Sequence, residues 1–150
     1  MPKSNAENAD TIEGVKTVLK VTAVCIYDES GLLLTVRKSG TTKFMHPGGK
    51  PEPGESAAQA GSRELKEEVG ITVSPDALEL LGVWMATAAN EADTDIEATV
   101  FTAPGSWKQT NIRAAAEIAE LRWMDVSTAA HFDDLAPLLT DHVLPLLQRK

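Results

Sequence analysis

The chain has 150 residues, 43% of them hydrophobic, and a formal net charge of −8 at neutral pH. A chain of this length can bury one core without disulfides, and its acidity, with no basic stripe to offset it, excludes a surface for duplex nucleic acid. No apolar run approaches membrane-spanning length, so we expect no association with a membrane.

The first expected strand follows a polar N-terminal segment, residues 1–14, which lacks the apolar core of a signal peptide. We therefore expect a cytoplasmic protein whose domain spans residues 15–150. Val15–Tyr27 is predicted to form a long strand, and Leu32–Lys38 to return as its hairpin partner after a short turn. Cys25 is the only cysteine, which excludes an intrachain disulfide and favours a buried thiol.

A short helix is expected after the turn at residues 47–54, which is rich in glycine and proline. Ser56 and Gln59 have the spacing of a capping box at the start of this helix. Gly70 is the kind of residue that ends a helix. The turn and helix together occupy the centre of the chain.

The second half of the chain predicts three further strands and a helix. Leu78–Ala89, Asp95–Thr102 and Ile118–Met124 are apolar and β-rich. Asp133–Arg149 carries leucines at helical spacing, with Pro145 placed to kink or split the helix. Strands on both sides of a central helix, closed by a C-terminal helix, predict an α/β fold with a mixed sheet between helices.

The central helix carries a group of acidic side chains. Glu64, Glu67 and Glu68 are spaced i, i+3 and i+4, which places them on one helical face. One interpretation is a solvated charged face. Like charges at this spacing destabilise a helix unless something neutralises them, and the preceding turn lets the backbone approach a ligand closely. We therefore favour a site for a hard divalent cation such as Mg²⁺, with phosphate chemistry as its use.

The segment from Gly49 to Ile71 resembles the Nudix signature at every specified place, and the neighbouring PGGK and ELRW stretches extend the resemblance. The matching residues are Gly49, Glu55, Arg63, Glu64, Leu65, Glu67, Glu68, Gly70 and Ile71. Membership of this family implies an α/β/α sandwich. It also implies a hydrolase that cleaves the diphosphate linkage of a nucleoside diphosphate joined to another moiety. The single-domain length is similar to that of MutT-like nucleoside triphosphate pyrophosphohydrolases.

Charge alone explains why such a reaction needs a cation, because the anionic oxygens of a diphosphate repel an incoming hydroxide. We predict Glu64, Glu67 and Glu68 as ligands of Mg²⁺, for which Mn²⁺ could substitute, with the Gly48 or Gly49 carbonyl completing the set.

The resemblance leaves the general base open between two residues. In some family members the base is the glutamate that corresponds to Glu64, and in others it is a glutamate in a loop near the late strand. Glu117 matches that late position, as a base or a further metal ligand, and Glu120 is a weaker candidate. Arg63 is predicted to brace Glu67 and is counted with the catalytic residues.

Substrate-binding residues are harder to predict. Arg37 and Lys43 precede the glycine turn and are candidates for the distal phosphates, and Glu55 is a third candidate. His46 has two interpretations, a contact with substrate and a strand-end histidine with its hydrogen bonds satisfied, and we favour the second. The segments that would select the substrate, residues 78–102 and 104–114, show no pattern that we can decode.

Two alternatives to an enzyme stay open. One is a non-catalytic Nudix module that binds nucleotides, and the other is an interaction protein with an incidental acidic helix. The first is disfavoured because no glutamate of the signature is missing. We expect a nucleotide-type small-molecule substrate as the partner and a homodimer as the assembly.

Overall fold

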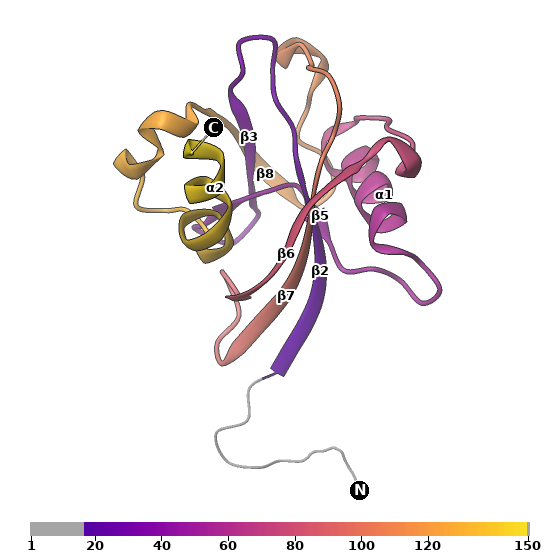
Figure 1. Ribbon diagram of the computed structural model, residues 1–150, viewed down its shortest axis with the longest axis vertical. Coiled ribbons are helices and arrows are strands. Elements are labelled where there is room, and N and C mark those ends of the chain that lie inside the picture. The colour runs from indigo at the N-terminus through magenta and orange to yellow at the C-terminus, as the bar shows by residue number, and fades with distance from the viewer. Residues whose placement is uncertain (1–16, 150) are drawn as a thin grey trace, which may run out of the picture.

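Two sheets lie between two helices in the computed structural model, which describes residues 17–149 of the chain (Figure 1). The polar segment predicted at residues 1–14 lies outside the described residues, as do the first two residues of the predicted first strand. The helices lie on opposite sides of the strands (Figure 1). The predicted α/β fold with a mixed sheet between helices is therefore confirmed.

The larger sheet has four strands in the order β5-β2-β7-β6. These are β5 (Gly48–Gly49), β2 (Thr17–Cys25), β7 (Thr94–Thr102) and β6 (Glu79–Thr87). β2 and β7 run parallel over nine residue pairs, while the other pairs are antiparallel. The smaller sheet is antiparallel in the order β4-β3-β8. It consists of β4 (Phe44–Met45), β3 (Leu33–Lys38) and β8 (Ile118–Met124).

The predicted hairpin between the first two strands is wrong. β2 pairs with β7 along one edge and with β5 along the other, so β3 has no free edge of β2 to join. The two strands meet only near their turn, where the N–H of Leu34 donates to the carbonyl of Ile26 at 2.8 Å. Asp28 closes that turn by accepting from the N–H groups of Ser30 and Leu32. β3 then continues into the second sheet.

The C-terminal helix begins later than its sequence pattern predicts. Residues 134–136 are extended, because the N–H of Phe44 donates to Asp134 and the N–H of Ala136 donates to Phe44. Pro137 also disfavours a helical conformation for the residue before it. A π-helical turn at Leu139–Val143 leads into α2 (Leu144–Gln148). The predicted interruption near Pro145 is thus confirmed.

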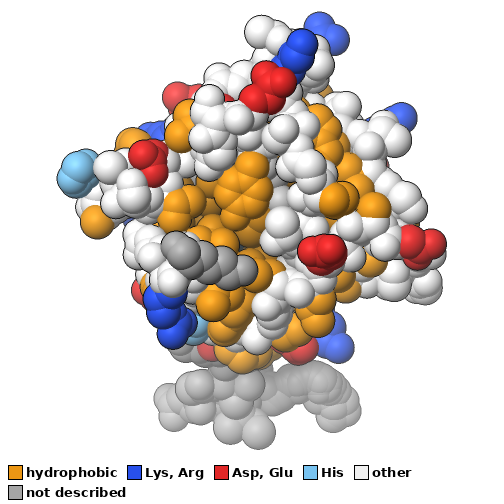
Figure 2. Space-filling model, turned by 45° about the horizontal axis from the view of Figure 1, so that its top comes forward, with side chains coloured by type: hydrophobic (Ala, Val, Ile, Leu, Met, Phe, Trp, Pro, Cys, Tyr) orange, Lys and Arg blue, Asp and Glu red, His pale blue; other side chains and the backbone are white. Residues whose placement is uncertain are grey.

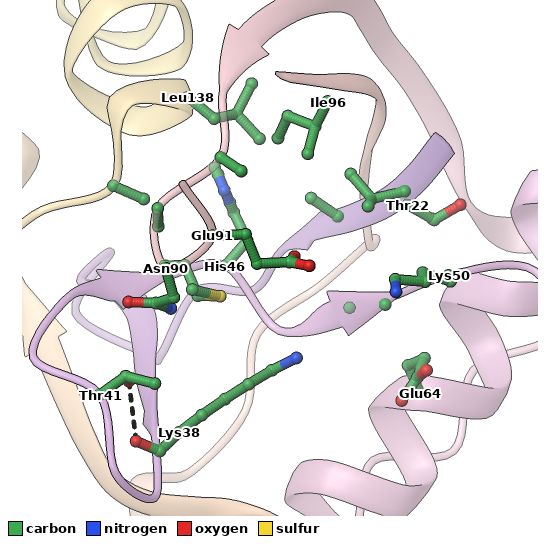
Figure 3. Close-up of a pocket in the computed structure, with 18 of the residues that line it drawn as sticks. Thr22, Lys38, Thr41, His46, Lys50, Glu64, Asn90, Glu91, Ile96 and Leu138 are labelled. Carbon is green, nitrogen blue, oxygen red and sulfur yellow. Dashed lines mark hydrogen bonds between the residues drawn. The ribbon is translucent and has the colours of Figure 1, made fainter. Parts of the chain in front are cut away.

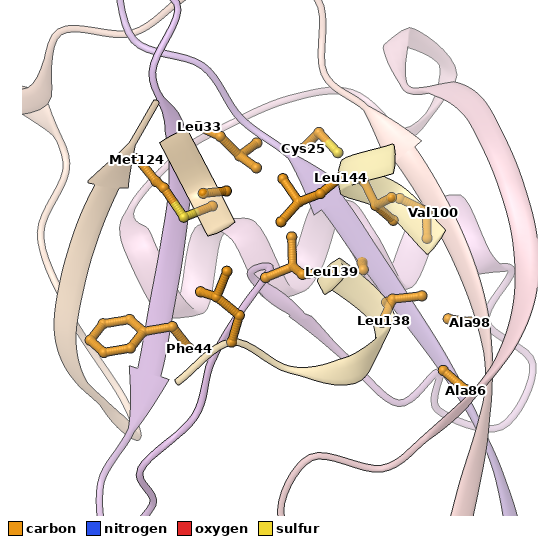
Figure 4. Close-up of a cluster of buried hydrophobic side chains, with 14 residues drawn as sticks. Cys25, Leu33, Phe44, Ala86, Ala98, Val100, Met124, Leu138, Leu139 and Leu144 are labelled. Atoms are coloured by element: carbon orange, nitrogen blue, oxygen red, sulfur yellow. The ribbon is translucent and has the colours of Figure 1, made fainter. Parts of the chain in front are cut away.

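Two apolar clusters hold the layers together, one on each side of the larger sheet. The cluster under α2 includes Cys25, Val100 and Leu139 (Figure 4). The cluster under α1 (Ala57–Val69) includes Val24, Leu65 and Val69. Successive side chains of a strand point to opposite faces of the sheet, so neighbouring residues of β2 pack into opposite clusters. Cys25 is buried, as predicted, and this burial raises the pKa of its thiol to about 12.

Short 3-10 turns connect the main elements at Pro75–Ala77, Gln109–Asn111 and Val126–His131. On the face shown in Figure 2, apolar side chains gather in the middle and charged side chains lie mainly around the margin. No helix within residues 17–149 has the length and apolar composition needed to cross a membrane.

Candidate active site

The central helix starts and ends where the sequence predicts. The Ser56 side chain accepts from the Gln59 N–H at 3.1 Å, and the Gln59 side chain accepts from the Ser56 N–H at 2.8 Å. This is the reciprocal capping box. Gly70 ends the helix with a φ of 76°, a left-handed conformation that glycine adopts without steric cost. α1 is therefore fixed at both ends, which orients its acidic face.

Glu68 is the most deeply buried of the acidic side chains, with 1% of its surface exposed. Its Oε1 accepts from the Gly48 N–H at 3.1 Å. Its Oε2 is buried and has no hydrogen-bond partner among residues 17–149. Burial raises the pKa of Glu68 to about 8. A buried carboxylate oxygen without a partner is costly, so this position favours a ligand that supplies positive charge.

Glu64 lies against the glycine turn. A Cβ atom placed on Gly49 would collide with the Glu64 carboxylate, so any other residue at position 49 would force the Glu64 side chain to move. Burial raises the pKa of Glu64, while the charge of Arg63 acts in the opposite direction. The turn and the helix thus bring the backbone of Gly48 and Gly49 beside two carboxylates. The structure thus brings these groups together, and their part in holding a metal stays a prediction.

Arg63 braces the acidic face as the spacing predicts. Its Nη1 donates to Glu67 at 3.1 Å. Its Nε and Nη2 donate to both carboxylate oxygens of Glu55, at 2.8 and 2.9 Å, and Nη2 also donates to the Lys50 carbonyl at 3.2 Å. The Arg63 hydrogen bond lowers the pKa of Glu55 to about 2. These contacts give Glu55 a positioning function, and its predicted part in substrate binding stays a prediction.

Glu117 joins the site from the loop before β8. It lines the same cavity as Glu64. Its negative charge contributes to the raised pKa of both Glu64 and Glu68. The loop is held by the N–H of Ser39, which donates to the Glu117 carbonyl at 2.8 Å. The chain thus brings Glu117 to the acidic helix, as the sequence analysis expected.

The carboxylates do not form a complete metal cage. Within the part of the chain that the structure describes, no three His, Cys, Asp or Glu side chains converge on one point. Glu67 is 51% exposed and turned toward Arg63. Mg²⁺ rarely needs such a cage, since it keeps several waters and binds through one or two carboxylates and substrate phosphates. The unpartnered Glu68 oxygen and the adjacent Glu64 fit that mode of binding.

A cavity of about 450 Å³ opens beside these carboxylates. Lys38, Lys50 and Glu64 lie toward one end of it, and Ile96 and Leu138 toward the other (Figure 3). This volume is within the range of small-molecule sites. The cavity therefore combines a charged end with an apolar end.

The predicted phosphate-binding cations are not among the residues that line this cavity. Arg37 donates instead to Glu120 at 3.0 Å and to the Thr41 carbonyl at 2.9 Å. The hydrogen bond from Arg122 is the main cause of the lowered pKa of Asp134, and the nearby charge of Lys43 adds to it. Lys38 and Lys50 take the positions expected for Arg37 and Lys43. The sequence analysis missed both lysines, although each lies within a few residues of the glycine turn.

His46 also lines the cavity, and the expectation that its hydrogen bonds are satisfied is wrong. The side chain is 4% exposed, and neither ring nitrogen has a partner among the described residues. Burial lowers the pKa of His46 to about 4.

Comparison with known proteins identifies the family. The model described as NUDIX domain matches residues 16–146. The chain is 46% identical over 59 residues to an m7GpppN-mRNA hydrolase, NUDT17, from Danio rerio; this match covers 35% of the chain and 20% of that relative. The matched part of the chain thus spans about a fifth of the curated relative's length.

Solved structures show the same fold. A MutT protein from Methanosarcina mazei Go1 has a TM-score of 0.74 and 23% identity, and covers 93% of this chain and 97% of its own. A MutT Nudix hydrolase from Burkholderia pseudomallei has a TM-score of 0.62 and 23% identity. It covers 89% of this chain and 98% of its own.

A third structure comes from Francisella tularensis. It is a bifunctional NMN adenylyltransferase/ADP ribose pyrophosphatase complexed with AMP and a manganese ion, with a TM-score of 0.66 and 20% identity, and it covers 90% of this chain and 42% of its own. The family match over most of the chain confirms the expected membership of the Nudix family. This chain belongs to the Nudix family.

Proposed function

We propose that this protein is a Mg²⁺-dependent pyrophosphohydrolase that cleaves the diphosphate linkage of a nucleoside diphosphate joined to another moiety, with nucleoside triphosphates as the first candidates. The observation that carries the proposal is the buried, unpartnered oxygen of Glu68 next to Glu64, beside a cavity that also presents lysines. The AMP and manganese ion of the Francisella tularensis neighbour are consistent with it.

The residues of α1 and the glycine turn would hold the cation. Glu64 and Glu68 offer carboxylate oxygens, Gly48 or Gly49 a carbonyl, and Glu117 a further carboxylate from the opposite loop. A bound divalent ion supplies charge neutralisation of the phosphates and a more acidic water. Mn²⁺ has the same preference for oxygen ligands, so we expect it to replace Mg²⁺.

The chain's own groups would carry the remaining steps. Lys38 and Lys50 line the charged end of the cavity and would bind the phosphate oxygens. Glu64 or Glu117 would accept the proton of the attacking water, since both carboxylates line the cavity. Arg63 would keep the acidic face in place through its bonds to Glu55 and Glu67.

A nucleotide panel tests this function. Purified protein is incubated with ATP, GTP, CTP, UTP, ADP-ribose and diadenosine tetraphosphate, with Mg²⁺ or with a chelator, and the products are identified by mass spectrometry. We expect at least one compound to be cut at a phosphoanhydride bond only when Mg²⁺ is present. Binding without cleavage of any compound would contradict the enzyme and support a nucleotide-binding module instead.

The proposal extends to the whole chain. We take residues 15–150 as the hydrolase domain and 1–14 as a separate polar segment. A cytoplasmic location suits a chain with one cysteine, Cys25, held buried and free of disulfides. We also propose a homodimer, which measurement of the mass in solution tests.

A further inference from the structure

His46 is held in place by the backbone on both sides. It follows β4, and the next residue, Pro47, accepts from the N–H of Val24 at 3.0 Å. The backbone of His46 is therefore placed at the junction between the smaller sheet and the glycine turn. Burial leaves 4% of the residue exposed.

The ring lies in the wall of the cavity on its apolar side. Figure 3 shows His46 between Leu138 and Glu91, with Asn90 close by and Lys50 and Glu64 farther along the cavity. Other residues lining the cavity are also apolar, among them Val21, Ala23, Met45, Ala136 and Ile96. A ligand whose phosphates meet the lysines would therefore place its other end near His46.

Both ring nitrogens lack a hydrogen-bond partner within residues 17–149. Buried polar atoms in folded proteins are almost always paired, and an unpaired one needs a reason. An imidazole can offer a donor at one nitrogen and an acceptor at the other. A flat heterocycle that has donors and acceptors along its edge could hydrogen-bond the His46 ring. Its apolar faces could at the same time pack against the apolar wall of the cavity. A nucleobase has this chemistry.

We propose that His46 is a specificity-determining residue that hydrogen-bonds the nucleobase edge, while Leu138 and Ile96 contact the base. This inference rests on the proposed function, because it takes a nucleotide as the substrate. Asn90 and Glu91 are exposed residues of the loop between β6 and β7 and line the same cavity as His46 (Figure 3). Because the ring nitrogens are buried, contact with a base requires this part of the cavity wall to shift when the base binds. A site built to hydrogen-bond a substrate rejects a compound that lacks the matching group.

The test compares His46→Leu, His46→Gln and the wild-type protein, with the exposed His131→Leu as the matched control. kcat and KM are measured for ATP, GTP, CTP and UTP, and for ribose 5-triphosphate, which has no base. We expect His46→Leu to raise KM for the preferred nucleotide about 10- to 100-fold with little change in kcat. Turnover of ribose 5-triphosphate stays unchanged, and His46→Gln recovers part of the loss.

Three results would overturn the inference. One is an unchanged KM in His46→Leu, and another is an equal loss for ribose 5-triphosphate, which indicates a structural role. If His46→Leu does not fold, as judged by thermal unfolding, His46→Gln carries the comparison, and we expect it to raise KM for the preferred nucleotide by less than about 10-fold. The third overturning result is that His46→Gln then keeps the wild-type KM for all four nucleotides.

Failure of the proposed function is distinguishable from failure of this inference. If the wild-type protein cleaves none of the four triphosphates, calorimetric titration with AMP, GMP, CMP and UMP replaces the kinetics. Weaker binding of one monophosphate to the His46 variants supports the base contact without any catalysis. Equal affinity for wild-type and variant proteins, or no binding to either, rejects it.

Discussion

The ion pair between Glu55 and Arg63 supports the acidic face of α1, and of the two residues only Arg63 lines the cavity. The Glu55 side chain is 15% exposed and accepts two hydrogen bonds from Arg63. We predict that Glu55→Gln lowers kcat about 10-fold, because outer partners of a metal site typically have effects of this size. Steady-state kinetics and thermal unfolding check this. Glu29→Gln is the control, since Glu29 is exposed and does not line the cavity. An equal effect of both variants would contradict the prediction.

The same pair sets a direction for pH dependence. The pKa of Glu55 is lowered from 4.5 to about 2 by Arg63, so the folded protein holds this carboxylate more strongly ionised than the unfolded chain does. The stabilisation from the pair is therefore complete above pH 4.5 and is lost as pH falls toward 2. It persists throughout the neutral range, where the proposed hydrolysis would be measured.

At the residue level, the sequence identified the acidic centre but not the cavity around it. Glu64 and Glu68 belong to one helix, so their spacing places them together before any tertiary contact is known. The cavity is also lined by residues from strands and turns, namely Lys38, Lys50 and His46. These residues share a cavity only when β2, β4 and the loop before β8 come together in the fold. Whether the His46 ring has a hydrogen-bond partner depends on tertiary structure, so the local sequence pattern could not predict that it has none among the described residues.

At the scale of the elements, the limits of the central helix could be predicted from nearby residues, whereas the pairing of the strands could not. The limits of α1 follow from its capping box and its terminal glycine, which act within a few residues. The separation of β2 from β3 depends on β7, which lies far along the chain and takes the edge of β2. The late start of the C-terminal helix depends on the contact with Phe44 and on Pro137. The proline was visible in the sequence, but the contact was not.

At the scale of the whole molecule, one sheet face exposes apolar side chains. Val18, Val83 and Met85 are each 51% exposed. Each of these residues pairs with a residue of β7, and the three partners are alternate residues of that strand. The three side chains therefore point to the same face of the larger sheet. A second copy covering this face would account for them. We predict a dimeric mass by light scattering and a monomeric mass for Met85→Glu. A monomeric wild-type protein would reject the dimer.

The central claim is that the acidic face of α1 binds the divalent ion needed for cleavage. Glu68→Gln keeps the shape of the side chain and removes its charge, and the exposed Glu79→Gln is the matched control. The measurement is the Mg²⁺ dependence of hydrolysis of the best compound in the nucleotide panel. We predict a loss in turnover on the order of 100-fold for Glu68→Gln and none for Glu79→Gln. A Glu68→Gln protein that folds and shows wild-type turnover at every Mg²⁺ concentration would contradict the account.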